Sequence, residues 1–402
     1  MEEKPKTIFV GLSGGVDSSV TAAILKDQGH NVVGVFIRTW QPDWIECTWR
    51  DERRDAMRVA AHLDIPFLEC DMEERYKTGV ADYMIAEYRS GRTPNPDVMC
   101  NREVKFGGFL DWALERGADF VATGHYAQVT TSSSPDAGEV PRHEAEGYQK
   151  TNTPQPFGLP PYIGGQARFQ LLRGIDPGKD QSYFLWTLTQ DQLKHILFPV
   201  GHLIKDETRK LAEKYELPTA TKKDSQGVCF IGEIDMKEFL GHYINHQPGD
   251  VLNTDGKIIG HHDGALFFTL GERHGFTILS KGTDESRYYV VDKDIKKNTI
   301  TVSENIDNQK ENYGKGQQIT ITNINMISEP LRPGQSYDAQ IRYHGEIKKM
   351  TLSGIKGDTA SVVLAGHDAT IAPGQSLVIY LPGEQSGNGD ICLGGGVIDS
   401  VA

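Results

Sequence analysis

In the first half of the chain, short continuous apolar runs alternate with longer amphipathic segments. The apolar runs predict four buried strands, at 7–12 ("TIFVGL"), 31–37 ("NVVGVFI"), 65–70 ("IPFLEC") and 119–124 ("DFVATG"). The amphipathic segments predict four helices, at 18–28, 50–63, 72–89 and 104–116. Strands that alternate with helices of this length are typical of βαβ units. The pattern therefore predicts an α/β fold, with a doubly wound parallel sheet covered by helices on both faces.

The remaining patterns divide the chain into three predicted domains. Residues 1–216 form the α/β catalytic domain, and 217–283 form a small α+β domain with one amphipathic helix at 236–243. From 284 to 402 apolar residues tend to recur at every second position, as in "QITITNINMI" and "SLVIYLPG". This pattern predicts a C-terminal antiparallel β-barrel. Residues 130–167 carry six prolines in 38 residues and predict a flexible insertion between two strands of a hairpin.

Composition narrows the class of protein. Of the 402 residues, 38% are hydrophobic and 24% are charged, as in soluble globular proteins. No apolar run reaches the roughly 18 residues that would span a membrane. The first strand begins at Thr7, which leaves no room for a targeting segment, so we expect a cytoplasmic protein. The net charge of −13 does not exclude a nucleic-acid partner, because one basic face can bind phosphates on an acidic protein.

The five cysteines are too few and too scattered for a disulfide scaffold. None of them forms a CxxC pair, so neither a zinc site nor an iron–sulfur cluster of common spacing is expected. Three are predicted to be small buried apolar residues: Cys47, Cys70 and Cys392.

The stretch "GLSGGVDSS" (11–19) joins the first predicted strand to the first predicted helix. It lacks the lysine of a Walker A loop and the glycine spacing of a Rossmann loop. Its backbone N–H groups and the first helical turn suit a phosphate group, and Asp17 is expected to contact Mg²⁺. The alternative is an ordinary turn in which Asp17 caps the helix. The pattern S-G-G-x-D-S resembles the PP-loop ATP pyrophosphatases (adenine nucleotide alpha hydrolase-like fold), which implies ATP as the nucleotide.

Two further segments place a cysteine among charged and turn residues. In "TPNPDVMCNREVKF" (93–106), two prolines favour an extended chain before Cys100. A helix predicted to start near Asn101, together with Arg102 and Lys105, should lower the pKa of the Cys100 thiol. In "KKDSQGVCFIGE" (222–233), Cys229 follows two lysines and a glycine turn.

Together with "TGHYA", "KDQSYFL", "QIRYHG" and "CLGGGVI", these segments resemble the bacterial tRNA-specific 2-thiouridylase family over nearly the full length. The resemblance implies a tRNA-uridine 2-sulfurtransferase that uses ATP to replace O2 of the wobble uridine (U34) by sulfur in tRNAs for Lys, Glu and Gln. It implies that the O2 atom is adenylated first, and that AMP and pyrophosphate are released. The insertion is longer than is usual in the family, and Ile37 stands where methionine is frequent.

The resemblance also assigns roles to individual residues. Cys229 carries a persulfide received from a sulfur-donor protein, Cys100 is the nucleophile that closes a disulfide with it, and Asp97 assists proton transfer. The expected ATP site consists of Gly11, Leu12, Ser13, Gly14, Gly15, Val16, Asp17, Ser18, Ile37 and Gly124. The expected tRNA contacts are Asn95, Pro96 and Asp97 at the target base, and Lys179, Asp180, Gln181, Arg342 and Tyr343 elsewhere. The expected state is a monomer.

Two alternatives remain at this point. A PP-loop ligase that aminates a small metabolite would release pyrophosphate without tRNA and would tolerate the loss of Cys229. A tRNA-binding protein without catalysis would bind RNA in the absence of ATP, but it gives no reason for Asp17, Cys100 and Cys229.

Overall fold

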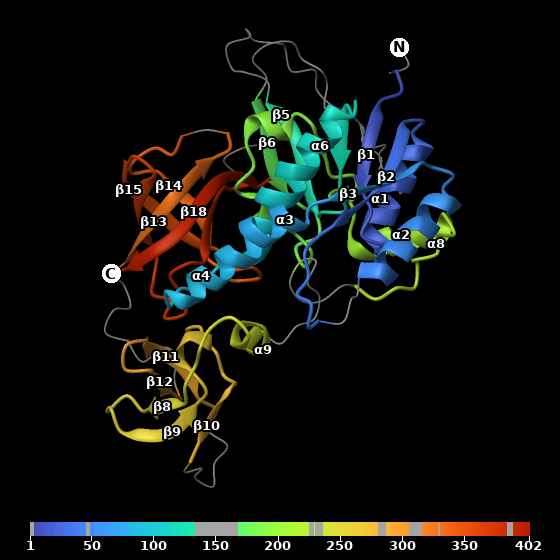
Figure 1. Cartoon of the computed structure of the whole chain (residues 1–402). Helices are drawn as coiled ribbons and strands as arrows, with labels where there is room; N and C mark the ends of the chain where they lie inside the picture. The colour runs from blue at the N-terminus through green and yellow to red at the C-terminus, as the bar shows by residue number, and fades with distance from the viewer. Residues whose placement is uncertain are drawn as a thin grey trace.

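The computed structural model describes residues 4–45, 49–132, 168–224, 229, 236–279, 287–304, 316–328, 330–383 and 389–402. Figure 1 shows three parts: an α/β part, a barrel packed beside it, and a small sheet below the barrel. Cys47 and residues 133–167 of the predicted insertion lie outside the described ranges. Within those ranges, no helix has both the length and the apolar character needed to cross a membrane.

The α/β part contains a five-stranded sheet in which every neighbouring pair is parallel. In the order β3-β2-β1-β4-β7, its strands are Phe67–Asp71, Asn31–Arg38, Thr7–Gly11, Phe120–Ala122 and Ile196–Leu197. The chain order reverses between β1 and β4, which makes the sheet doubly wound. Ligands of such sheets bind outside the carboxyl ends of the two strands at the reversal. The predicted fold class is confirmed.

Helices cover both faces of this sheet. On one face, Ile8 and Val10 of β1 pack against helices α1 (Val16–Asp27), α2 (Trp49–His62) and α8 (Lys205–Lys214). On the other face, Phe9 packs against two longer helical runs. The first run consists of α3 (Glu73–Tyr76), η1 (Lys77–Asp82) and α4 (Tyr83–Arg89). The second run consists of α5 (Pro96–Met99), η2 (Cys100–Phe109) and α6 (Leu110–Glu115). Ile8 and Val10 face one side of the sheet and Phe9 faces the other. Because both sides are covered by helices, all three positions are apolar.

A hairpin links the α/β part to the barrel. Strands β5 (Ala127–Ser132) and β6 (Arg168–Arg173) pair antiparallel, as predicted for the two sides of the insertion, and β6 also pairs with β18 (Ile391–Val401) of the barrel. After the hairpin come η3 (Ser182–Leu185) and α7 (Gln190–Leu193). The hairpin therefore extends the barrel sheet rather than the parallel sheet.

The small middle sheet is larger than predicted. Its strands, in the order β10-β9-β8-β12-β11, are Phe276–Ile278, Ile258–His262, Gly249–Leu252, Thr299–Ser303 and Tyr289–Asp294. The same stretch of chain contains η4 (Ala265–Phe267) and α9 (Met236–Gly241), whose Phe239 and Leu240 belong to the core of the α/β part. The predicted boundary at 283/284 assigned β11 and β12 to the barrel. That assignment is wrong, because Val290 and Ile300 share a core with Val251 and Phe268.

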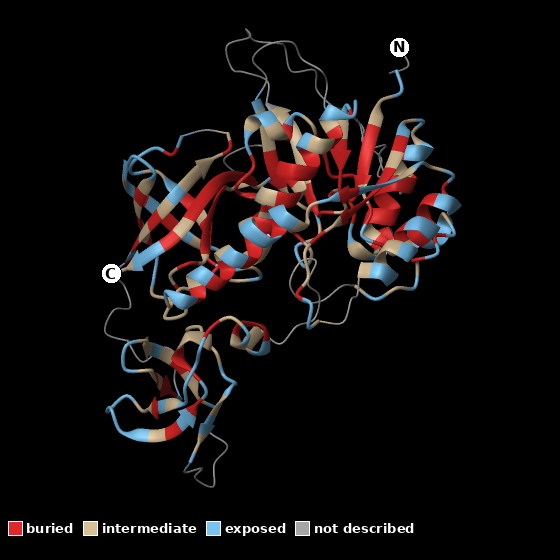
Figure 2. Ribbon diagram, viewed as in Figure 1, coloured by how far each residue is buried: buried red, intermediate tan, exposed pale blue. Residues whose placement is uncertain are grey.

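The C-terminal barrel has six antiparallel strands and closes through pairing of β13 with β18. In the order β13-β16-β15-β14-β17-β18, its strands are Gln317–Met326, Thr359–Leu364, Lys348–Lys356, Ser336–Gln340, Ser376–Leu381 and Ile391–Val401. Apolar side chains from alternate positions, such as Ile319 and Ile321, fill its interior. Figure 2 shows buried residues both in the barrel and in the α/β part beside it.

Candidate active site

The glycine-rich loop lies at the carboxyl end of β1, where the sheet topology predicts a ligand. The strand ends at Gly11, and α1 starts at Val16 with Gly15 as its N-cap. Gly14 has a φ of +71°, and a Cβ there would lie 2.5 Å from the carbonyl oxygen of Glu52. Only glycine fits this backbone position. The hydroxyl groups of Ser13 and Ser18 lie 3.2 Å apart across the turn.

The end of β4 lies directly against this loop. A Cβ on Gly124 would be 2.7 Å from the backbone nitrogen of Ser18 and 2.8 Å from the carbonyl carbon of Asp17. Ile37, at the end of β2, lies on the other side, with its Cδ1 3.7 Å from the place where a Cβ of Gly11 would be. The structure therefore brings the residues predicted for the ATP site together at one edge of the sheet.

A group of cations surrounds the loop, and the sequence analysis did not identify it. Lys205 Nζ lies 2.8 Å from Oδ1 of Asp17 and 2.9 Å from Oδ1 of Asp224. Lys222 donates to the carbonyl oxygen of Gly14 at 3.0 Å. These lysines follow the loop by about two hundred residues; Lys205 belongs to no segment singled out in the sequence, and Lys222 was noted only as a neighbour of Cys229. Their position in an α/β sheet depends on chain topology, which spacing does not reveal.

Asp17 itself is already engaged. Besides Lys205, it accepts a hydrogen bond of 2.9 Å from the Tyr126 hydroxyl. It does not cap α1, since Gly15 stands at the N-cap with no side-chain bond. Carboxylate oxygens suit Mg²⁺. No group of three or more metal-binding side chains occurs in the parts of the chain that the structure describes, so phosphate oxygens would have to complete the shell.

The two predicted reactive cysteines meet beside the sheet. The Sγ atoms of Cys100 and Cys229 lie 3.4 Å apart although 129 residues separate them in the chain. Both thiols are free. Cys100 is inaccessible, whereas the Cys229 residue as a whole is half-buried.

Asp97 and Tyr76 hold Cys229 in place. The backbone N–H of Cys229 donates to Oδ1 of Asp97 at 3.0 Å, and the Tyr76 hydroxyl donates to the Cys229 carbonyl at 2.8 Å. Asp97 is presented by α5, which Asn95 caps by accepting a bond from the N–H of Val98.

The helix that carries Cys100 starts earlier than predicted. With Asn95 as N-cap and Pro96 in the first turn, the start lies at Pro96 rather than near Asn101. Cys100 is therefore in the helix interior and receives no benefit from a helix N-terminus. Arg102 is exposed and pairs with Glu103.

The two thiols differ in their acidity, and not in the way predicted. Burial raises the pKa of Cys100 well above its usual value, so the predicted lowering is wrong. The pKa of Cys229 is lowered, first by the hydrogen bond from Cys100 and then, against the effect of burial, by the charge of Lys105. Burial also raises the pKa of Asp97, although the Cys229 N–H and Lys105 oppose this. In this arrangement Cys229 is the more acidic of the two thiols, and Cys100 is its hydrogen-bond donor.

The predicted tRNA contacts at 179–181 do not share one environment. Lys179 pairs with Asp224 at 2.8 Å, beside the glycine-rich loop. Asp180 is only 6% exposed and accepts bonds from the N–H groups of Gly174 and Ser182. Gln181 accepts a bond from the N–H of Tyr126. Asp180 and Gln181 therefore hold the loop before η3 by internal bonds.

Arg342 and Tyr343 lie on the barrel side of the same region. Arg342 is exposed. The ring of Tyr343 lies 4.4 Å from that of Phe184, and Tyr183 beside it hydrogen-bonds to Asn95. An aromatic cluster therefore connects the barrel to Asn95, the N-cap of the helix that carries Asp97.

Comparison with known proteins covers most of the chain. Residues 6–233 match the family described as tRNA methyl transferase HUP domain. Residues 237–304 match the tRNA methyl transferase PRC-barrel domain, and 316–398 match the aminomethyltransferase beta-barrel domain. The second range ends just after β12 and agrees with the middle sheet of the structure.

Full-length relatives are named tRNA-specific 2-thiouridylase MnmA. The protein of Bacillus velezensis is 40% identical, over 100% of this chain and 97% of that protein. The protein of Listeria monocytogenes serotype 4a is 41% identical, over 98% and 95%. A solved structure of the U34-tRNA thiolase NcsA from Methanococcus maripaludis is 15% identical, covers 60% of this chain and 65% of its own, and has a TM-score of 0.33. The resemblance inferred from the motifs is confirmed: the chain belongs to the tRNA-specific 2-thiouridylase family.

Proposed function

We propose that this protein uses ATP to replace O2 of the wobble uridine, U34, by sulfur in tRNAs for Lys, Glu and Gln. The observation that carries the proposal is the 3.4 Å approach of Cys100 and Cys229 next to Asp97, in a chain whose parallel sheet also carries an S-G-G-x-D-S loop. A metabolite-aminating ligase needs the loop but has no use for the cysteine pair.

The loop activates the uridine. Backbone N–H groups of residues 13–16 and the start of α1 hold the pyrophosphate end of ATP. Lys205 and Lys222, which now pair with Asp17 and Asp55, lie close enough to the loop to contribute positive charge. The uracil O2 attacks the α-phosphate, and pyrophosphate leaves with the electron pair of the broken bond. Asp17 would hold Mg²⁺, which supplies charge neutralisation at the phosphates.

The thiols then deliver sulfur. The Cys229 thiolate attacks the outer sulfur of a donor protein's persulfide, so that a Cys229 persulfide forms and the donor leaves as its thiolate. The terminal sulfur of that persulfide attacks C2. Cys100 attacks the inner sulfur as its proton passes to Asp97. The sulfur–sulfur bond breaks, its electron pair stays with the sulfur on C2, and AMP leaves. The resulting Cys100–Cys229 disulfide needs two electrons from an external dithiol.

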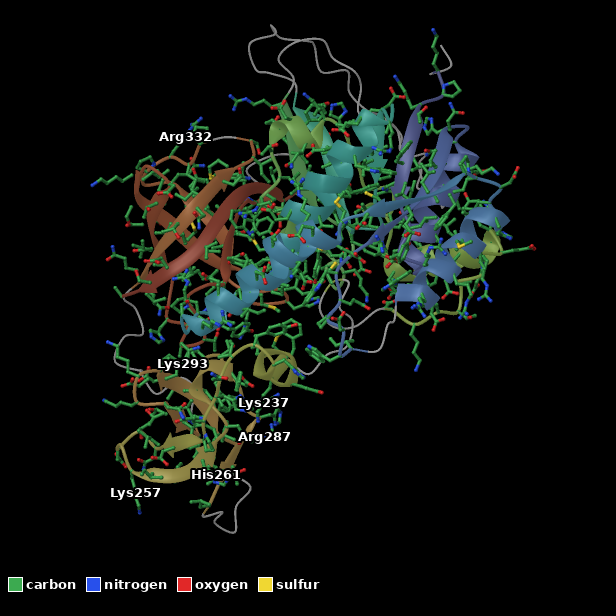
Figure 3. The ribbon with its side chains drawn as sticks, in the orientation of Figure 1. Lys237, Lys257, His261, Arg287, Lys293 and Arg332 are labelled. Atoms are coloured by element: carbon green, nitrogen blue, oxygen red, sulfur yellow. The ribbon has the colours of Figure 1, made fainter. Side chains whose placement is uncertain are left out.

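The tRNA must present an unstacked base to Cys229 and Asp97. Asn95, Pro96 and Asp97 are the proposed target-base contacts, and Lys179, Asp180, Gln181, Arg342 and Tyr343 are the proposed tRNA contacts elsewhere. Asp180 and Gln181 would act indirectly, by holding the loop before η3 through their internal hydrogen bonds. Exposed Lys257, His261 and Arg287 on the middle sheet (Figure 3) support a role of this sheet in phosphate binding. We place a monomeric enzyme in the cytoplasm, where tRNA and a persulfide donor meet.

The test is complementation of cells that lack their own 2-thiouridylase. The parent chain should restore 2-thiouridine, seen as retarded tRNA on a mercury-containing gel and confirmed by nucleoside mass spectrometry. Cys100→Ser and Cys229→Ser should abolish it. Cys392→Ser is the matched control, because Cys392 is as buried as Cys100 but lies in the barrel strand β18.

Two results would overturn the proposal. One is a Cys229→Ser variant that restores as much 2-thiouridine as the parent chain does. The other is a well-expressed parent that makes no 2-thiouridine in cells and none when purified and supplied with ATP, sulfide and tRNA. Pyrophosphate release with a small amine and without tRNA would favour the ligase instead.

A further inference from the structure

Lys105 brings a positive charge to the pair of thiols. Its side chain hydrogen-bonds to the sulfur of Cys229, and its Nζ lies 3.3 Å from Nε2 of His125. Lys105 and Cys229 are both half-buried, whereas Cys100 behind them is inaccessible. An ammonium group in such a place is costly unless it is paired. Its pairing with a sulfur atom is most favourable when that sulfur is ionised.

The unusual register of η2 explains how Lys105 reaches this position. In an α-helix a residue five positions after Cys100 would point roughly 140° away from it, since each residue advances by about 100°. Cys100–Phe109 is π-helical, and there the hydrogen bonds join residues five apart. Cys100 and Lys105 therefore stand one above the other on the same face, toward Cys229. π-Helical turns are often found at functional sites.

His125 orients the ammonium. Burial lowers the pKa of His125 well below its usual value, so the ring is neutral. An ammonium can only donate, so Nε2 accepts from Lys105, and Nδ1–H donates to Oγ1 of Thr123 at 2.7 Å. His125 is only 7% exposed, which leaves its ring little freedom to turn. The row Thr123–His125–Lys105 thus fixes the direction in which the positive charge points.

The other groups that face Cys229 do not supply this charge. Asp97 accepts from its N–H and raises the pKa of its thiol, and Tyr76 binds only its carbonyl. Cys100 donates its S–H, but that proton leaves when Cys100 acts as nucleophile. Among the described residues around this sulfur, Lys105 is the cation whose charge favours the thiolate directly.

We propose that Lys105 is the counter-ion that keeps Cys229 ionised and ready to take sulfur from the donor, and that His125 is the positioning residue that holds the Lys105 ammonium against it. This inference rests on the proposed role of Cys229 as the sulfur acceptor. It explains why η2 is π-helical next to Cys100, and it gives His125, which takes no part in the sulfur-transfer steps, a positioning role.

The test measures the acidity of Cys229 in the full-length protein without ATP or tRNA. The rate of iodoacetamide modification is followed from pH 5 to pH 10 by mass spectrometry of the peptide that contains Cys229. Lys105→Met should slow modification at pH 7 about 10-fold, by moving the pH midpoint up by roughly one unit. Lys105→Arg should restore most of the rate, and His125→Gln should slow it about 3-fold.

Lys194→Met is the matched control, because Lys194 is exposed and pairs only locally with Asp191. An unchanged pH profile in a folded Lys105→Met variant overturns the inference, and if that variant does not fold, an unchanged profile of His125→Gln does so. The readout needs no thiolation. A shifted midpoint therefore supports the inference even if complementation fails, and an unshifted one overturns it even if complementation succeeds.

Discussion

At the scale of single residues, Asp224 connects the nucleotide loop with the segment that carries Cys229. Its carboxylate binds Lys179 at 2.8 Å, Lys205 at 2.9 Å and Arg209 at 2.7 Å. Burial alone would raise its pKa, but the hydrogen bonds and charges of these cations lower it to about 2. A carboxyl group with a lowered folded-state pKa stabilises the protein above its unfolded pKa, and this contribution is lost as the pH falls through the folded value.

We therefore predict that Asp224→Asn lowers the free energy of unfolding by about 1 kcal/mol at pH 7, a value reduced from the full shift because solvent screens part of the site. The difference from the parent should shrink between pH 4 and pH 2. Urea unfolding at several pH values measures it. Asp191→Asn, which removes an exposed ion pair, should change stability by less than about 0.5 kcal/mol. Equal stability of Asp224→Asn and parent at pH 7 would contradict the prediction.

At the scale of elements, the contact between the end of β4 and the first turn of α1 shapes the nucleotide site. Gly124 makes this contact possible because it has no Cβ: the nearest atoms are backbone atoms of Ser18 and Asp17, which cannot turn away as a side chain would. Any larger residue must push β4 and α1 apart. The N–H groups that would hold pyrophosphate belong to that same first turn.

We predict that Gly124→Ala weakens ATP binding at least about 10-fold, equivalent to about 1.4 kcal/mol. Calorimetric titration with ATP, or the ATP-induced rise in melting temperature, measures the effect. Gly354→Ala in barrel strand β15 is the control, because a Cβ there meets nothing within 4 Å. Parent-like ATP affinity of Gly124→Ala would show that the loop does not depend on this contact.

At the scale of the whole molecule, all three parts meet at the segment just before Asn95. The N–H of Thr93 donates to the carbonyl of Pro373 in the barrel at 2.8 Å, and Gln375 donates to the carbonyl of Thr93 at 3.0 Å. The hydroxyl of Thr93 lies 3.3 Å from that of Thr269 in the middle part. The segment that leads into α5 and Asp97 is thus held by two neighbouring domains as well as by its own.

We predict that Gly374→Ala slows thiolation about 10-fold and leaves ATP affinity unchanged. Gly374 has a φ of +96°, and a Cβ would lie 2.8 Å from the backbone nitrogen of Thr93. Single-turnover formation of 2-thiouridine and an ATP titration separate the two effects. Gly366→Ala is the control. Gly366 also has a positive φ, +79°, but a Cβ there meets no atom within 4 Å, so this substitution adds backbone strain without a steric clash. Equal rates for the two variants would contradict the prediction.

Much of the α/β part could be predicted because its signals are local. Strands near 7–12 and 31–37 and the helices that follow them are read from contiguous apolar spacing, and the glycine loop lies between neighbouring elements. The assignment of β11 and β12 failed for the opposite reason. A period-two strand shows which of its faces is buried, but not which sheet it joins, since that depends on partners distant in sequence.

Local sequence is enough to predict the parallel α/β architecture, the S-G-G-x-D-S loop, the two candidate reactive cysteines and the family. Three features become visible only in the folded chain: Cys229 rather than Cys100 is the more acidic thiol, Lys105 and His125 stand beside it, and Lys205 and Lys222 reach the loop. The pKa of a group depends on its burial and on the charges within a few ångströms. Both are set by chain segments that fold together from distant parts of the sequence, and no local spacing encodes them.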